Sequence, residues 1–296
     1  MRYTKDDLTI EVMEYGAELV SLQKGGQSQR EYLWGGDAAF WNRHSPILFP
    51  VVGKPFNNEL HIGGRSYPMK QHGFARDSEF ERVVAADDGL TYRLKDAYRP
   101  EVYPYHYGLE VAYRIDGSRL RVCWRVENRG EGTMYYQIGA HPAFLLPDYD
   151  ERDDVHGYVR YYGREGGAVS PRLFSALEEG NRVSLSDGDV RIPSEMPITG
   201  DTFAGDALMI EHGQVTKATL CDKRGDPVLS VECAGADAYG VWAPHKAGCP
   251  FVCLEPWCGI CDPKGFVGDI SQREIIHALA AGGVGCFEYT ITIHEP

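Results

Sequence analysis

The fold class is decided by one stretch of the sequence, GLEVAYRIDGSRLRVCWRVE at residues 108–127. Apolar and polar residues alternate in both halves of this stretch, which is the period of a strand with one buried face. Asp116 and Gly117 stand between the halves and favour a tight hairpin turn. The stretch therefore predicts two neighbouring antiparallel strands over residues 108–115 and 120–127.

The same alternation recurs towards both ends of the chain, at residues 8–13, 17–22 and 287–293. Helical patterns are few, and we expect about two helical turns over residues 271–280 and one or two over residues 169–180. The sequence has no linker rich in Pro or Ser, no repeat of fixed period and no regular alternation of strands with helices. We therefore expect an all-β fold, a large antiparallel β-sandwich with few short helices, formed as a single domain over residues 1–296.

The charge of the chain limits the classes of partner. A net charge of −13 argues against nucleic acid, because phosphate contacts need a basic face and the sequence has no run of Lys or Arg. It also argues against attraction to an anionic membrane, and no stretch of about 18 apolar residues is present to span one. The amino-terminal residues lack the apolar core of a signal peptide. We expect a soluble cytoplasmic protein, monomeric or homodimeric, that binds a small polar molecule.

One carboxylate, Glu255, stands in the apolar stretch PFVCLEPW at residues 250–257. The β-branched and aromatic residues predict a buried strand, and Pro256 followed by Gly259 predicts that the strand ends just after the acid. An ionised carboxylate is costly to bury unless it is paired. Glu255 is therefore either a structural acid that meets an arginine inside the fold or a general base whose pKa is set by partial burial.

Two histidines stand next to a residue that interrupts regular backbone structure, a glycine in one case and a proline in the other. His72 precedes Gly73, a residue that lets backbone or ligand approach closely. His141 follows the predicted strand 134–138 and is itself followed by Pro142, which breaks the strand. Each histidine is either a hydrogen-bonded structural residue or a proton donor and acceptor facing a cleft.

Three further charged residues are candidates for a binding site. Arg43 lies in the apolar stretch 41–54, which is bracketed by cations, and is either a surface cation or a donor fork aimed into a pocket. Arg76 follows His72 by four residues. Asp206 lies just before the apolar residues 207–210, where it either caps a turn or places an acid at the mouth of a cleft.

Eight cysteines are present, and four of them lie between residues 249 and 261. Cys258 and Cys261 have the spacing of half a zinc site or of a redox pair, whereas Cys253 alternates into the apolar strand. No second pair with that spacing completes a zinc pattern, so we interpret these cysteines as small buried apolar residues and expect neither a metal nor a cofactor. The sequence also has no Gly-rich phosphate loop, no HExxH and no GxSxG motif to support nucleotide transfer, zinc proteolysis or a serine hydrolase.

Three motifs together resemble the aldose 1-epimerase, or galactose mutarotase-like, superfamily: QHGFAR at residues 71–76, GAHPAF at 139–144 and CLEPW at 253–257. The segment PILFPVVG at residues 46–53 further resembles the LacX-like branch of that superfamily. The resemblance spans nearly the whole chain, and three ordered motifs are more specific than any one of them. It implies a β-supersandwich that interconverts the α and β anomers of an aldohexose without a cofactor.

The resemblance also implies roles for individual residues. Glu255 matches the general base of the family, His141 its general acid, and His72 the second histidine at the substrate. Asp206 matches the acid that binds sugar hydroxyl groups. One carboxylate and one imidazole suffice to open and reclose a pyranose ring, so this assignment agrees with the chemistry of the residues themselves.

The nature of the substrate is left open by the arginines. Mutarotases of free galactose have an arginine near the first motif that contacts the sugar, and this sequence departs from that pattern. Arg43 and Arg76 instead resemble the arginines that bind phosphate in hexose-6-phosphate mutarotases. Two other classes also stay open: a carbohydrate-binding module without turnover, and a glycoside hydrolase, which would need a second carboxylate about 5–10 Å from Glu255.

Overall fold

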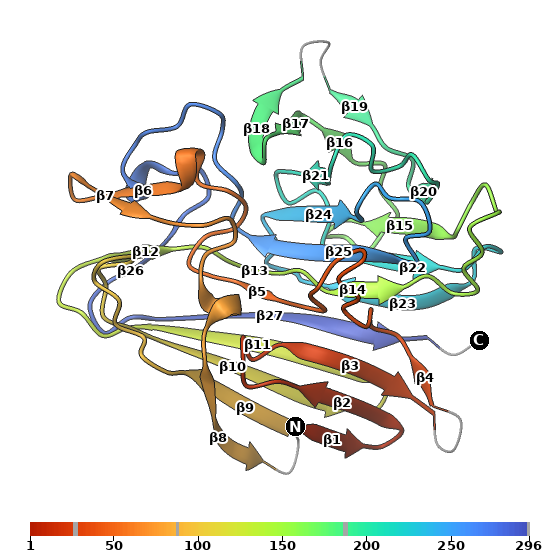
Figure 1. The fold of residues 1–296 in the computed structure, drawn as a ribbon, viewed down its shortest axis with the longest axis horizontal. Helices are drawn as coiled ribbons and strands as arrows, with labels where there is room; N and C mark the ends of the chain where they lie inside the picture. The colour runs from red at the N-terminus through yellow and green to blue at the C-terminus, as the bar shows by residue number, and fades with distance from the viewer. Residues whose placement is uncertain (26–28, 87–88, 186–188, 295–296) are drawn as a thin grey trace.

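The predicted hairpin lies inside the largest sheet of the structure (Figure 1). This computed structural model describes residues 1–25, 29–86, 89–185 and 189–294. Strands β10 (Tyr107–Asp116) and β11 (Arg119–Asn128) pair antiparallel, with Ile115 opposite Leu120 beside the turn. Buried and more exposed side chains alternate along both strands, so the prediction from residues 108–127 is confirmed.

Within the described residues this largest sheet has nine antiparallel strands. In spatial order they are β20 (Glu195–Pro197), β15 (Tyr158–Tyr162), β22 (Lys217–Cys221), β23 (Pro227–Glu232), β27 (Val284–Ile293), β11, β10, β9 (Gly89–Leu94) and β8 (Phe80–Ala86). The strand predicted near the carboxyl terminus is confirmed as β27, and it lies between β23 and β11.

A second sheet carries Glu255. Its strands in the described part of the chain are β21 (Leu208–Ile210), β24 (Ala238–Trp242), β25 (Phe251–Cys258), β13 (Ile138–Ala140) and β5 (Ile47–Leu48), with β14 (Ala143–Leu145) also paired to β25. All eight residues of β25 are buried. The prediction that the strand ends just after Glu255 is wrong. Pro256 lacks an N–H, but it lies opposite the gap between β13 and β14, where the sheet requires no hydrogen bond from it.

The remaining strands form a four-stranded sheet and four two-stranded ribbons among the described residues. The sheet consists of β1 (Arg2–Lys5), β2 (Leu8–Val12), β3 (Leu19–Lys24) and β4 (Arg30–Glu31). The ribbons pair β6 (Glu59–Ile62) with β7 (Arg65–Pro68), β12 (Met134–Tyr136) with β26 (His277–Leu279), β16 (Arg172–Leu173) with β19 (Val190–Arg191), and β17 (Ser175–Glu178) with β18 (Asn181–Ser184).

Buried tyrosines tie the two smaller sheets to the largest one. The hydroxyl of Tyr113 on β10 donates to the carbonyl of Ala17, just before β3, over 2.6 Å. The hydroxyl of Tyr239 on β24 donates to the carbonyl of Val231 on β23 over 3.1 Å. Apolar side chains fill the space between these layers, which confirms the predicted all-β antiparallel sandwich.

The two predicted helices are wrong. Residues 271–280 contain only the end of a 3₁₀ turn, η3 (Ile270–Gln272), followed by strand β26, and residues 169–180 contain β16 and β17. The ring of His277 on β26 packs against Tyr136 on the paired strand β12, so cross-strand packing overrides the local helical pattern. The other 3₁₀ turns are η1 (Phe56–Asn58) and η2 (Ala75–Asp77). Throughout the described ranges, no helix has the length and apolar character needed to cross a bilayer.

Candidate functional site

All six charged or ionisable residues singled out in the sequence line one cavity of about 400 Å³. They come from five separate segments of the chain and are Arg43, His72, Arg76, His141, Asp206 and Glu255. The sequence-based hypothesis that these residues share a site therefore agrees with their positions in the structure.

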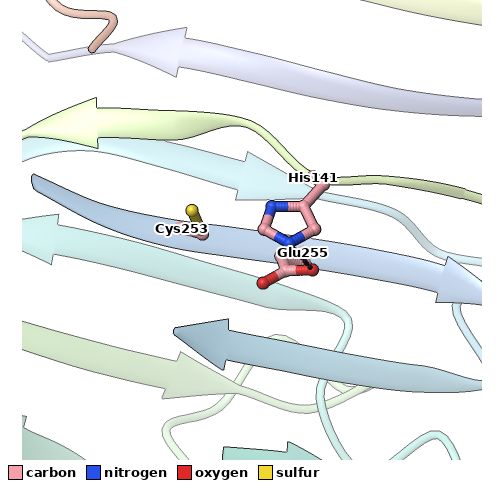
Figure 2. Close-up of side chains that lie close together, drawn as sticks. All are labelled: His141, Cys253 and Glu255. Atoms are coloured by element: carbon pink, nitrogen blue, oxygen red, sulfur yellow. Dashed lines mark ion pairs between the residues drawn. The ribbon is translucent and has the colours of Figure 1, made fainter. Parts of the chain in front are cut away.

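The deepest part of the cavity holds an imidazole beside a carboxylate. Glu255 is 1% exposed on β25, and His141 lies between β13 and β14, which both pair with the same edge of β25. Because the chain leaves the sheet for only two residues there, the imidazole is held directly beside β25 (Figure 2). His141 Nε2 is 3.2 Å from Glu255 Oε2. We name these two residues the catalytic pair after the role that we propose for them.

Burial shifts both members of the catalytic pair towards their uncharged forms. It raises the pKa of Glu255 well above its usual value, an effect that the Trp257 side chain opposes and the charge of Asp206 reinforces. Burial and, next in size, the charge of Arg76 lower the pKa of His141 to about 3. Burial therefore favours a proton of the pair on Glu255 rather than on His141.

Tryptophans form the walls around the catalytic pair. The ring of Trp41 stacks on His141 at a centroid distance of 4.8 Å, and Trp242 meets the same imidazole edge-on at 5.6 Å. Trp257 lines the cavity as well. Sequence reasoning missed the part played by Trp41 and Trp242, although aromatic residues next to candidate polar groups are typical of ligand cavities.

His72 faces His141 across the cavity, with ring centroids 5.6 Å apart. Its backbone has a φ of 65°, and its amide N–H donates to the carbonyl of Gly53 over 2.7 Å. The N–H of Gly53 in turn donates to His72 Nδ1 over 3.1 Å. Burial lowers the pKa of His72 well below its usual value, so the ring is neutral, carries its proton on Nε2 and can donate one hydrogen bond.

The two arginines differ in their partners. Arg43 forms an ion pair of 2.7 Å with Asp77, whereas Arg76 donates to the backbone carbonyl of Gln71 over 2.7 Å. Arg76 Nε is buried and makes no hydrogen bond within the described residues. Burial and the charge of Arg43 lower the pKa of Arg76 to about 10, so Arg76 remains charged at neutral pH.

Asp206 lies in a turn beside the cavity. Its Oδ1 accepts a hydrogen bond from the N–H of Ala207 over 2.8 Å, as in a turn, and its backbone φ is 76°. The residue is exposed and also lines the cavity.

The cysteine pair with metal-like spacing does not form a shared site. Cys258 Sγ lies 3.6 Å from the carbonyl oxygen of Gly235, whereas Cys261 Sγ lies 3.7 Å from Met209 Sδ. Both side chains are buried, Cys258 in the main apolar core and Cys261 in a smaller apolar cluster. Their environments support the interpretation of these two residues as buried apolar side chains.

Gln137, which sequence reasoning missed, joins three segments behind the cavity. Its side chain is fully buried, and its Oε1 accepts from the N–H of Val52 over 3.0 Å. Its Nε2 donates to the carbonyls of Ile260 and Ile275 over 3.1 and 2.8 Å. The first of these bonds fixes the backbone next to Gly53 and so supports the position of His72.

Substitution of Gln137 by Met is expected to lower the free energy of unfolding by roughly 3 kcal/mol or more. Methionine leaves one buried N–H and two buried carbonyls without their partner, and each such group costs about 1–3 kcal/mol. Equilibrium unfolding in urea measures the loss. The matched substitution Gln23→Met, on β3 near the surface, should change stability by less than about 0.5 kcal/mol. Equal losses in both variants would contradict the role given to Gln137.

The fold and the cavity together place the chain in a known class. A family model described as aldose 1-epimerase matches residues 2–158, and the chain belongs to this family. Among curated proteins it is similar to the chromosomal and plasmid forms of Protein LacX from Lactococcus lactis subsp. lactis. Each is 28% identical over 262 residues, which cover 86% of this chain and 85% of the relative. The resemblance to the LacX-like branch is thereby confirmed.

Solved structures agree with this family assignment. A galactose mutarotase related enzyme from Lactobacillus acidophilus has a TM-score of 0.88 and 26% identity, with 100% of this chain and 98% of that chain covered. A galactose mutarotase-like protein from Lactobacillus casei ATCC 334 has a TM-score of 0.86 and 28% identity, with 99% of each chain covered. The predicted galactose mutarotase-like fold is confirmed.

Proposed function

We propose that this protein is an aldose 1-epimerase that interconverts the α and β anomers of an aldohexose by acid–base opening of the ring. The observation that carries the proposal is the 3.2 Å contact between His141 Nε2 and Glu255 Oε2 in a cavity lined by tryptophans and polar groups. A carboxylate and an imidazole within reach of one bound sugar provide a base and an acid for the two oxygens of the anomeric carbon.

In the proposed reaction, ionised Glu255 removes the proton of the anomeric hydroxyl group while protonated His141 gives its proton to the ring oxygen. The bond between the anomeric carbon and the ring oxygen breaks, and an open-chain aldehyde forms. Rotation about the adjacent carbon–carbon bond turns the other face of the carbonyl towards the ring hydroxyl group. In the reverse step His141 takes the proton of the ring hydroxyl group while Glu255 returns its proton to the carbonyl oxygen. The ring closes again and gives the other anomer.

The shifted pKa values support these roles. A carboxylate whose pKa is raised by burial is a stronger base, and an imidazolium whose pKa is lowered is a stronger acid. The transfer moves the catalytic pair from carboxylate and imidazolium to carboxyl and neutral imidazole, which are the forms favoured by burial. The apolar setting thus favours the open-chain stage of the reaction.

The other cavity residues have places in this scheme. His72, neutral and protonated on Nε2, donates a hydrogen bond to a sugar oxygen, and Asp206 accepts from sugar hydroxyl groups at the mouth. The indole of Trp41, stacked on His141, keeps the imidazole in a fixed plane. Positioning of this kind makes acid–base catalysis effective, because both proton transfers require the sugar in one orientation.

Polarimetry of freshly dissolved α-glucose and α-galactose tests the proposal. The protein is expected to accelerate the approach to anomeric equilibrium without changing the final rotation. Protein that is folded by circular dichroism, binds either sugar in titration calorimetry and accelerates neither would be a carbohydrate-binding module. That outcome would overturn the proposal.

A second candidate substrate, an aldohexose 6-phosphate, is favoured by one observation. Arg43 and Arg76 line the same cavity, and Asp77 forms its ion pair with Arg43. The guanidinium of Arg76 has a backbone carbonyl as its partner, and its buried Nε makes no hydrogen bond within the described residues, so it has hydrogen-bonding capacity for a bound phosphate.

If phosphate is bound there, Arg76→Gln is expected to raise KM for glucose 6-phosphate at least about 10-fold, the effect of losing a charge-assisted hydrogen bond. The KM for glucose should change by less than about 2-fold under the same conditions. Coupled detection of the anomers measures both constants. Equal turnover of the two sugars by the wild type, with no change in the variant, would remove the phosphorylated substrate from consideration.

A further inference from the structure

We propose that the catalytic pair and Cys253 together bind a soft divalent metal ion such as Zn²⁺, and that the bound ion inhibits the protein reversibly. The binding follows from the positions of three side chains alone. The inhibition rests on the proposed function, because it requires that the catalytic pair moves protons.

Three different ligand atoms meet at this point. Among the described residues, His141, Cys253 and Glu255 are the group that offers a nitrogen, a sulfur and an oxygen within 4.8 Å of one another. Cys253 and Glu255 are two residues apart on β25, so their side chains leave the same face of the strand beside the ring of His141 (Figure 2). The 3.2 Å between Nε2 and Oε2 is close to the separation of two ligands on one tetrahedral zinc ion with bonds of about 2.0–2.2 Å.

One oxygen of this group has no hydrogen-bond donor among the described residues. All three side chains are buried, and Glu255 Oε2 makes no hydrogen bond of good geometry within the described residues despite its closeness to Nε2. A buried oxygen acceptor without a donor is costly, and a metal ion would satisfy it. As the ion enters, the carboxyl group of Glu255 and the thiol of Cys253 each lose a proton to solvent. The dication beside the resulting carboxylate and thiolate then has no net charge.

The charges around the site select the kind of metal. Arg43 and Arg76 line the same cavity and oppose any cation, so a single carboxylate oxygen is too weak to hold Mg²⁺ or Ca²⁺ there. Thiolate and imidazole ligands favour zinc, cobalt and cadmium. The sulfur of Cys253 is therefore the group that decides both affinity and selectivity.

Metal binding uses the same two atoms as catalysis. With Nε2 and Oε2 bonded to the ion, neither atom can accept or donate a proton to the sugar. Cys253 is fully buried and does not line the cavity, and the proposed mechanism gives its thiol no role. Substitution of Cys253 is therefore expected to abolish inhibition by the metal ion and to leave turnover intact.

Titration of metal-free protein with Co²⁺ tests the binding without reference to activity. A thiolate bonded to Co²⁺ gives a charge-transfer absorption in the near ultraviolet, and the wild type is expected to reach saturation at one ion per chain. Cys253→Ser is expected to lose this band, with affinity reduced by more than the roughly 10–100-fold caused by loss of an outer hydrogen bond. The matched variant Cys261→Ser, whose thiol lines the cavity outside the cluster, is expected to keep the band.

Inhibition is measured by polarimetry with Zn²⁺ and then with excess chelator. Zn²⁺ should stop mutarotation by the wild type but not by Cys253→Ser, chelator should restore it, and Mg²⁺ should have no effect. Absence of the cobalt band in the wild type, or its survival in Cys253→Ser, would overturn the proposed site. A normal cobalt band in protein that turns over no sugar would leave the metal site standing and refute the proposed function.

Discussion

Substitution of Glu255 by Gln is expected to lower kcat for mutarotation by about 10²–10⁴-fold, the usual contribution of a positioned base. The amide keeps the size of the side chain on β25, but it cannot take the proton of the anomeric hydroxyl group. KM should change little, because other cavity residues hold the sugar. Polarimetry with protein of verified folding measures the effect. Full activity in this variant would remove Glu255 from the mechanism.

The same substitution is expected to stabilise the fold at alkaline pH. Because burial raises the pKa of Glu255, the folded protein holds this proton more tightly than the unfolded chain does. The stabilisation that comes from the protonated Glu255 is present at low pH. It is lost as the pH rises through the pKa that Glu255 has in the folded protein. Gln has no such loss, so Glu255→Gln should exceed the wild type by about 1–3 kcal/mol at alkaline pH and by less near the ordinary carboxyl pKa.

Chemical unfolding of both proteins in chelator, across this pH range, checks the expectation. Glu232→Gln on β23, which removes an exposed carboxylate, is the matched control and should have a pH dependence like that of the wild type. A pH-independent difference between Glu255→Gln and the wild type would mean that the carboxyl group titrates equally in the folded and unfolded states.

The second large effect is expected from Gly53→Ala, which should destabilise the fold by about 2–5 kcal/mol and abolish activity. Gly53 has a φ of 68°, and a Cβ atom there would lie 2.1 Å from the Cβ of Cys261. The backbone must shift to relieve this overlap. Such a shift separates the Gly53 N–H from His72 Nδ1 and moves the imidazole away from the cavity.

Gly64→Ala separates the backbone strain of a positive φ from the overlap with Cys261. Gly64 has a φ of 78° in the turn between β6 and β7, and a Cβ atom there would have no neighbour within 4 Å. This control has the conformational strain alone and should lose about 1–2 kcal/mol while keeping full activity. Equal effects of the two substitutions, measured by urea unfolding and polarimetry, would contradict the close packing of Gly53 on Cys261.

Much of the fold could be predicted from the sequence because the deciding pattern is local. The alternation over residues 108–127 follows directly from a sheet with one buried face, and the Asp116–Gly117 turn fixes its register. The strand β26 could not be predicted in this way. It is held by pairing with β12, more than a hundred residues away, which a window of neighbouring residues does not report.

The candidate site likewise contains residues that the local sequence reveals and residues that it does not. Glu255 and the two histidines could be singled out because an acid in an apolar strand, or a His beside Gly or Pro, is unusual in its own sequence context. Gln137 and Gly53 could not, since their importance comes from contacts made only in the folded chain. The side-chain roles that depend on long-range packing are the ones that the sequence leaves hidden.

The position of β25 also bears on how the protein becomes active. Glu255 sits on a strand whose neighbours on the two edges come from residues 138–145 and 238–242, and the cavity is completed by segments near residues 43, 72 and 206. The pairing of β25 with residues 138–145 is long-range and forms slowly, because the long intervening chain must be ordered before these contacts are made. A refolding chain would therefore gain most of its secondary structure before any turnover, and recovery of turnover would mark the last step of assembly.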